Sequence, residues 1–387
     1  MRYLLNMTLK TACVIFSLCI VFVALTCVSS AEEKDGEEKA LEDFGDVIEE
    51  LPDDIKNKLP EAVADGGEDI GEGVLEMTDA TYLFGVLREI LGIELSSSTK
   101  LFVSLLGLIV IVGIFGAAKN SFGDSAMPVA IRFLSVSTLM LTVVRTQYSC
   151  FLRVQEYFEQ LNTVMLGMIP ITGAVWALGG NVSTASAGTA TMYTFLNISQ
   201  MIFGKTVIPM ASIGTCLAFC NGINPEVDMR RISSSIRKAY LFLIGAVVTV
   251  FGAVLSTQTT ITVAADCATA RTAKFISSTV IPIVGGSVGD SLRTVASGVQ
   301  YLKGVLGVGG IALIFLGVLP VLVSLLLTRF VLSFLGGVAG FFGCGEIGGV
   351  LGELSDVYSG IIAAVAMTGV MFILSLFIFI KTAVAIM

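Results

Sequence analysis

Long apolar runs recur along the chain from residue 101 to its end. The pattern predicts membrane-spanning helices, because a run of about 17 to 25 mostly apolar residues is long enough to cross a bilayer. Several runs are close to the minimum length, so the sequence predicts an all-α polytopic membrane protein with about seven to nine transmembrane helices. The candidate spans are Leu101–Ala118, Ala126–Val144, Leu161–Gly180, Thr189–Gly204, Val207–Ile223, Ala239–Leu255, Gly304–Thr328, Phe330–Gly345 and Gly360–Ile380.

The region before these runs is mostly polar, but apolar residues recur in it at helical spacing. The spacing predicts two short amphipathic helices. Between them the sequence ADGGEDIGEG, at 64–73, has too few apolar side chains to offset the entropy of ordering and predicts a flexible linker. The whole region is interpreted as a solvated spacer, with a partner-docking arm as the alternative. The periodic residues are Leu41, Phe44, Val47, Ile48 and Leu51, then Leu83, Val86, Leu87, Ile90 and Leu91.

Two similar motifs indicate an internal repeat. The sequence IPITG at Ile169–Gly173 returns as IPIVG at Ile281–Gly285, 112 residues later. Neighbouring apolar runs shift by the same amount, which predicts tandem units at 126–238 and 239–350, a construction common in transporter folds. A first membrane helix at 99–125 would precede them, and a loop with a last helix at 351–387 would follow. Chance similarity between apolar segments is the alternative.

The stretch RTAKFISSTVIPIVGG, Arg271–Gly286, combines cations, a proline and glycines between two apolar runs. In a helix Arg271 and Lys274 share a face, whereas Pro282 lacks the amide hydrogen that a regular helix needs. Such backbone belongs inside protein or against water. The sequence therefore predicts that both IP elements are broken or interfacial and line or gate a polar passage; a surface elbow is the alternative. The candidate residues are Arg271, Lys274, Pro282, Gly285, Gly286, Asp290, Arg293, Pro170 and Gly173.

Composition supports a membrane protein with an acidic lead. Of the 387 residues, 55% are hydrophobic and 14% are charged, and the mean hydropathy is +0.88. The net charge of −8 arises from residues 32–94, where acidic residues far outnumber basic ones, whereas the remainder is mildly cationic. We therefore expect residues 32–98 to face solvent outside the membrane.

The first 31 residues read as a secretory signal. Arg2 and Lys10 precede the apolar run Thr11–Cys27, and cleavage is expected after Ala31. An uncleaved first membrane helix is the alternative. With the mature N-terminus outside, nine spans would place most loop cations in the cytoplasm, as the positive-inside rule requires. These cations are Lys119, Arg230, Arg231, Arg237, Lys238, Arg329 and Lys381.

Residues for catalysis or metal binding are scarce. The chain has no histidine, which removes the usual general base and the commonest metal ligand. It also has no phosphate-binding glycine loop with a lysine, so no enzyme activity, cofactor, metal or nucleic-acid partner is expected. Spaced glycines predict close helix packing in lipid instead, at Gly336 with Gly340 and at Gly345 with Gly349.

The chain resembles the stage III sporulation protein AE family. The resemblance rests on RTAKF at Arg271–Phe275, IPIVGG at Ile281–Gly286, Asp290, and LKGVLGVGG at Leu302–Gly310, in that order. It implies a multi-pass protein of the mother-cell membrane around the forespore. It also implies partners in a channel complex: an ATPase resembling secretion motors, small membrane proteins, an intermembrane-space ring protein and a forespore-side protein, with membrane lipid around it.

Three functional hypotheses follow. The first is a non-enzymatic membrane subunit of the mother cell–forespore channel or of a secretion-like apparatus. The second is a stand-alone secondary transporter in which Arg271, Lys274 and Asp290 meet a small, anionic solute between the repeats. The third is a structural scaffold for the ring and the motor. A homo-oligomer is compatible with each of them.

Overall fold

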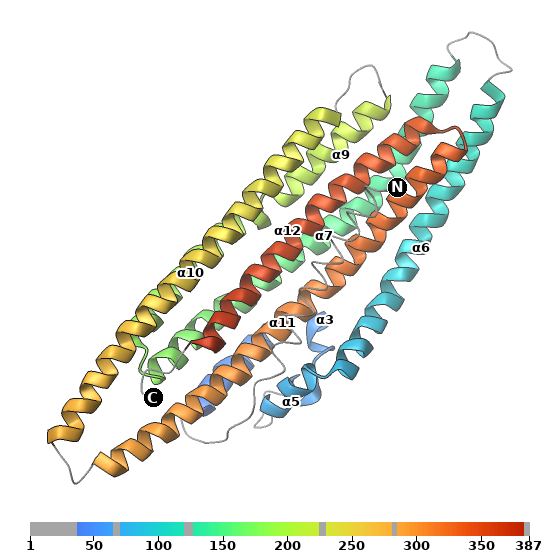
Figure 1. Cartoon of the computed structure of the whole chain (residues 1–387). Coiled ribbons are helices and arrows are strands. Elements are labelled where there is room, and N and C mark those ends of the chain that lie inside the picture. Colours follow the sequence, from blue (N-terminus) through green and yellow to red (C-terminus); the bar gives the residue numbers. More distant parts are fainter. Residues whose placement is uncertain (1–36, 65–69, 120–126, 224–229, 281–284, 383–387) are drawn as a thin grey trace.

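The computed structural model describes residues 37–64, 70–119, 127–223, 230–280 and 285–382. Within these residues every regular element is a helix (Figure 1), which confirms the all-α prediction. The expected signal at 1–31 lies outside the described residues.

Long helices build the molecule and reverse direction at each connection (Figure 1). The short π-helix η1 joins α8 to α9, so these three elements together form one leg of the bundle. Six stretches in the described part are long and apolar enough to cross a membrane. The elements are α6 (Ala80–Lys119), α7 (Met127–Leu178), α8 (Val182–Ser199), η1 (Gln200–Gly204), α9 (Val207–Ile223), α10 (Arg230–Val280), α11 (Gly285–Phe341) and α12 (Gly345–Lys381).

Nine candidate spans thus become six helical legs. Ala126–Val144 and Leu161–Gly180 belong mostly to the single helix α7, because the polar stretch between them does not end the helix. Its side chains bond to neighbouring helices instead; Gln147 Nε2, for example, donates to Thr215 Oγ1 of α9 at 2.8 Å. The two apolar runs on either side of Arg329 likewise share α11. An even number of legs leaves the start of α6 and the end of α12 at the same end of the bundle.

The helices are much longer than a bilayer is thick. At about 1.5 Å per residue, the 52 residues of α7 span about 78 Å, against about 30 Å for a hydrocarbon core. One half of the bundle exposes many large apolar side chains, as a membrane-facing surface requires. In the other half, most of the described side chains of α11 are buried. Examples in the exposed half are Phe133, Leu141, Phe242, Val250 and Phe334.

We name the two ends of the bundle by their charge. At the basic end α6 leads into α7, α9 into α10 and α11 into α12, and cations from Arg230 to Lys238 lie on the first turns of α10. At the acidic end α6 begins, α7 leads into α8, α12 ends, and the acidic N-terminal segment packs (Figure 1).

The N-terminal segment folds onto the long helices. It forms α2 (Glu37–Glu49), α3 (Asp53–Lys56), α4 (Glu61–Ala64) and α5 (Ile70–Met77), which contact α7 and α11. Phe44 and Ile48 are almost fully buried there. A solvated spacer is therefore the wrong description of residues 37–77, because their apolar faces find partners on the bundle. The end of the expected linker, from Ile70 onward, is helical for the same reason.

Two central helices make the core. Helix α11 packs along α12 over most of its length and also contacts α6 and α7, whereas α12 contacts α9 and α10 (Figure 1). A close backbone contact joins Gly336 to Gly348, where an added Cβ on Gly348 would lie 2.8 Å from the Gly336 carbonyl oxygen. Gly340 and Gly345 have open space around them, because they border the exposed connection between the two helices.

Candidate functional site

The second IP element lies at the acidic end, where α10 leads to α11. Arg271 and Lys274 belong to the last turns of α10, and Gly285, Gly286, Asp290 and Arg293 to the first turns of α11. Pro282 and the side chains of residues 269–295 lie outside the described part of the chain. The described residues on either side of Pro282 are the end of α10 and the start of α11.

These two helix ends extend past the rest of the bundle (Figure 1). Asp266 of α10 contacts the start of α8, and Lys303 of α11 contacts the residue that follows α12. Beyond Asp266, α10 continues to Val280, which corresponds to about 21 Å of helix. Before Lys303, α11 begins at Gly285, which corresponds to about 27 Å of helix. We call residues 267–280 and 285–302 the projecting hairpin.

A buried carboxylate fixes the first leg of the projecting hairpin. Asp266 is 6% exposed. Its carboxylate accepts hydrogen bonds from Thr184 N at 2.9 Å, Ser183 N at 3.2 Å and Thr184 Oγ1 at 2.9 Å. These amides open α8, where helical N–H groups lack partners and the helix dipole favours negative charge. A residue of α10 thus caps the N-terminus of α8.

A buried cation fixes the second leg. Lys303 is 2% exposed, and its Nζ donates to the Thr382 carbonyl oxygen at 3.0 Å. Thr382 ends α12, where free carbonyl groups favour positive charge. The Asp266 and Lys303 contacts, which we call the base contacts, therefore pair each charge with the helix end of opposite polarity.

The first IP element lies inside a continuous helix. α7 passes through Pro170 without ending, although a break was expected there. Its neighbours Ile169, Ile171 and Thr172 are buried, and Gly173 lies against Thr189 of α8, so packing holds the helix together where one backbone hydrogen bond is missing.

The structure does not bring the two IP elements together. Pro170 lies eight residues before the end of α7, about 12 Å from the acidic end toward the basic end. Arg271 and Lys274 lie past the base contact at Asp266, in the opposite direction. A passage lined by both elements therefore has no support in this arrangement.

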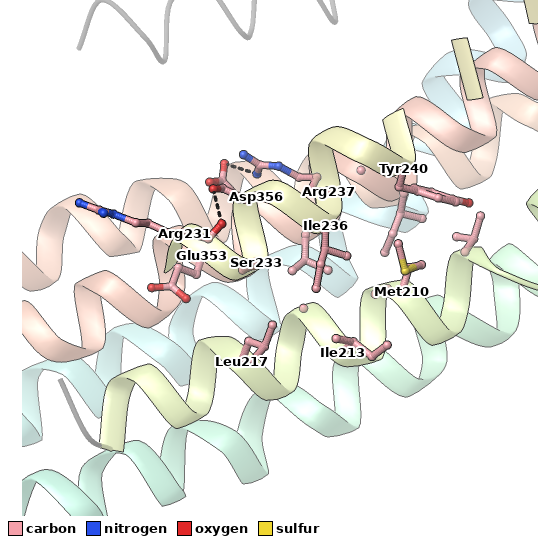
Figure 2. A pocket seen from close by; sticks show the side chains of 17 residues that line it. Met210, Ile213, Leu217, Arg231, Ser233, Ile236, Arg237, Tyr240, Glu353 and Asp356 are labelled. Carbon is pink, nitrogen blue, oxygen red and sulfur yellow. Dashed lines mark hydrogen bonds and ion pairs between the residues drawn. The ribbon is translucent and has the colours of Figure 1, made fainter. Parts of the chain in front are cut away.

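A slot opens at the basic end between α9, α10 and α12 (Figure 2). Its volume is about 270 Å³. Arg237 pairs with Asp356 across it at 2.9 Å, and Asn221 Nδ2 donates to Glu353 Oε1 at 2.6 Å. Behind them Arg329 is buried and interacts electrostatically with Asp356 and Arg237. These contacts tie α9, α10, α11 and α12 together in a mostly apolar setting.

A second cavity, of about 500 Å³, lies beside the middle of the bundle. Arg153 of α7 crosses it and contacts Glu94 Oε1 of α6 at 2.5 Å and Ser324 Oγ of α11 at 3.2 Å. The wall includes Pro320 of α11 and Lys58, which follows α3. This ion pair and its serine partner join three long helices beneath the N-terminal segment.

Comparison with known proteins identifies the family. The model of the family described as stage III sporulation protein AE matches residues 68–383, which include all the long helices. This chain belongs to the stage III sporulation protein AE family. A curated relative, the stage III sporulation protein AE of Bacillus subtilis (strain 168), is 24% identical over 284 residues, which cover 73% of this chain and 71% of the relative. No solved structure matches.

Several polar residues of this stage III sporulation protein AE family member escaped the sequence reasoning. Asp266, Arg153 and Glu94 make charged interhelical contacts that the sequence motifs do not predict. The available signal was an ionisable residue inside an apolar helix, which is costly unless it is paired. In the described residues no cluster of three or more His, Cys, Asp or Glu side chains could hold a metal ion.

Proposed function

We propose that this chain is an integral membrane subunit of the mother cell–forespore channel, or of a secretion-like complex in the same place, that supports endospore development. Its family is a sporulation family, and its helices are suited to a membrane. The observation that carries the proposal is the projecting hairpin, because helices that extend past their own bundle offer a surface that the chain itself does not cover.

The charge of the two ends supports one orientation. Cations gather at the basic end, which the positive-inside rule assigns to the cytoplasm. The acidic segment, the projecting hairpin and Lys381 would then lie on the extracytoplasmic side, between the two membranes. The nine-span prediction puts Lys381 in the cytoplasm. With six legs the chain ends on the side of the membrane where α6 starts, so Lys381 would lie on the extracytoplasmic side.

The orientation suggests which partners meet which end. An ATPase in the mother-cell cytoplasm would reach the basic end, whereas an intermembrane-space ring protein would reach the projecting hairpin. Arg271, Lys274, Asp290 and Arg293 are then candidate partner-contact or gating residues on that hairpin, together with Gly285 and Gly286 at the start of α11.

The packed interior favours a subunit over a stand-alone transporter. The central helices bury mainly apolar side chains against each other, among them Leu306, Leu313 and Leu376. Of the two cavities described above, the slot at the basic end is below the roughly 300 Å³ at which solute pockets begin, and the larger one is crossed by the Arg153–Glu94 ion pair. Conduction in this proposal therefore belongs to the assembled complex.

Complementation of a deletion strain tests the proposal. Cells that lack the gene are expected to show collapsed forespores and lost forespore-specific transcription, and wild-type protein is expected to restore both. Arg271→Glu should insert into the membrane normally and yet fail to restore spores, because a reversed charge repels a partner at modest cost to folding. Arg88→Glu, on an exposed position of α6, is the matched control.

The outcome separates the hypotheses. Normal spores in the deletion strain would overturn the proposal. Loss of both complex recovery and function in Arg271→Glu would favour the scaffold hypothesis, whereas loss of function with an intact complex would favour a passage or gate. Solute uptake by vesicles that contain only this protein would favour the transporter.

A further inference from the structure

The slot at the basic end has the form of a site for a long amphiphile. It follows the helix axes from Leu217 to Val207 on α9 and from Arg231 to Tyr240 on α10. These stretches correspond to about 15 Å and about 14 Å of helix. Because the helices cross the membrane, the long axis of the slot lies along the direction in which lipid chains lie.

One end of the slot is polar and the other apolar. Arg231, Ser233, Ser234 and Arg237 line it on the first turns of α10, next to the end of the bundle (Figure 2). Farther along, the walls are Met210 and Ile213 of α9 with residues of α12. This polarity matches a molecule with its head at the membrane surface and its chain toward the interior.

The charges near the polar end favour an anionic head. Arg231 and Arg237 share the slot with two acids, Glu353 and Asp356, and Arg329 lies behind them, which leaves an excess of one positive charge. Arg237 uses Nη1 for Asp356, and a guanidinium has five N–H donors, so it can bind a second anion. Arginine suits phosphate because its fork of donors matches the phosphate oxygens.

The slot also borders surface that should contact lipid. Ile213 is 47% exposed, Ile232 54% and Phe242 80%. A transmembrane helix is about 10 Å across. A single acyl chain is thinner and can enter from the bilayer.

We propose that this slot binds one acyl chain of an anionic phospholipid whose phosphate contacts Arg231 and Arg237. Basic pockets between transmembrane helices are suited to acidic lipid head groups in this way. The site lies at the end of the bundle opposite the projecting hairpin and does not depend on the proposed channel role.

Native mass spectrometry of the detergent-purified full chain tests the site. Phosphatidylglycerol and phosphatidylcholine with identical acyl chains are titrated separately. We expect wild type to prefer phosphatidylglycerol about tenfold, because both lipids carry the phosphate but only phosphatidylcholine adds a quaternary ammonium, which the cationic end of the slot repels. The double variant Arg231→Gln/Arg237→Gln should lose the preference, whereas Arg88→Gln/Lys100→Gln, which removes two exposed cations of α6, should keep it.

Two further variants separate lipid binding from folding. Asp356→Asn removes the anion that competes for Arg237, so it should bind phosphatidylglycerol more tightly even if the bundle is less stable. Gly360→Leu fills the slot: a Cβ at Gly360 meets only Arg237 within 4 Å, at 3.7 Å and 4.0 Å, so the larger side chain extends into the cavity and should reduce binding of both lipids. Glycerol 3-phosphate, which lacks acyl chains, should not compete.

Three results would overturn the assignment. The first is equal binding of the two lipids by wild type. The second is an equal loss of preference in the α6 control. The third is a protein that co-purifies at this face and is released by Gly360→Leu while lipid preference is unchanged, which would assign the slot to a partner.

Discussion

Replacement of Asp266 by alanine should release the start of α8 from α10. The substitution removes three hydrogen bonds to a carboxylate and leaves the Ser183 and Thr184 amides without an acceptor. Thr184 is fully buried, so water cannot easily replace the lost partner, although its hydroxyl keeps a contact with Thr262 Oγ1 at 3.1 Å. A lost N-cap costs about 0.5–2 kcal/mol and a buried unsatisfied amide about 1–3 kcal/mol. We expect a loss of about 3 kcal/mol in the free energy of unfolding.

Asp266→Asn should cost less, about 1 kcal/mol, because the amide oxygen still accepts from Thr184 N while the charge at the helix N-terminus is gone. Fluorescence of Trp176, the only tryptophan in the chain, reports unfolding near this contact because its ring packs on Gly188 of α8. Hydrogen exchange at Thr184 should accelerate in Asp266→Ala. Glu89→Ala removes an exposed carboxylate of α6 and serves as the control.

Equal stability of Asp266→Ala and wild type, with unchanged exchange at the start of α8, would refute the reasoning. An equally large loss of stability in Glu89→Ala would also refute the reasoning, since the loss would then come from the change in net charge and not from the helix cap.

Three more substitutions test the interhelical contacts. Arg153→Ala should cost about 1–3 kcal/mol because it leaves Glu94 without its cation in a setting that the adjoining cavity partly opens to solvent, and adding Glu94→Gln should restore most of the loss in thermal unfolding. Gly348→Ala should cost about 1–3 kcal/mol, because its Cβ would lie 2.8 Å from a backbone oxygen of α11, whereas Gly340→Ala, in open space, should be neutral in the same assay. Lys303→Ala should cost about 1.5–3 kcal/mol and speed hydrogen exchange in the last turn of α12; unchanged exchange would argue against a capping role.

Periodicity and hydropathy predicted the helical class because the bilayer imposes both. They could not predict the number of legs, because a polar stretch inside one long helix looks in a hydropathy profile like a loop between two spans. In α7 and α11 such stretches stay helical because residues such as Gln147 and Arg153 find partners on other helices. That pairing depends on tertiary structure, which a single sequence does not reveal.

The same limit applies to the sites. Pro170 was expected to break its segment, but the neighbouring helix supports α7 through that position. The base contacts at Asp266 and Lys303 pair residues about 80 positions apart with helix ends, and a local pattern does not predict such pairs. The tandem repeat at 126–238 and 239–350 stays a prediction.

Helix α10 runs without a proline from Arg230 to Val280 and is held by Asp266 between its two ends. Arg237 lies about 43 Å from Asp266, and Val280 lies about 21 Å beyond it on the other side. Because α10 also packs on α8, α9 and α12, the bundle holds the long arm in place and the short arm continues it as one helix. A cantilever of this kind carries any shift of the bundled part directly to its outer end.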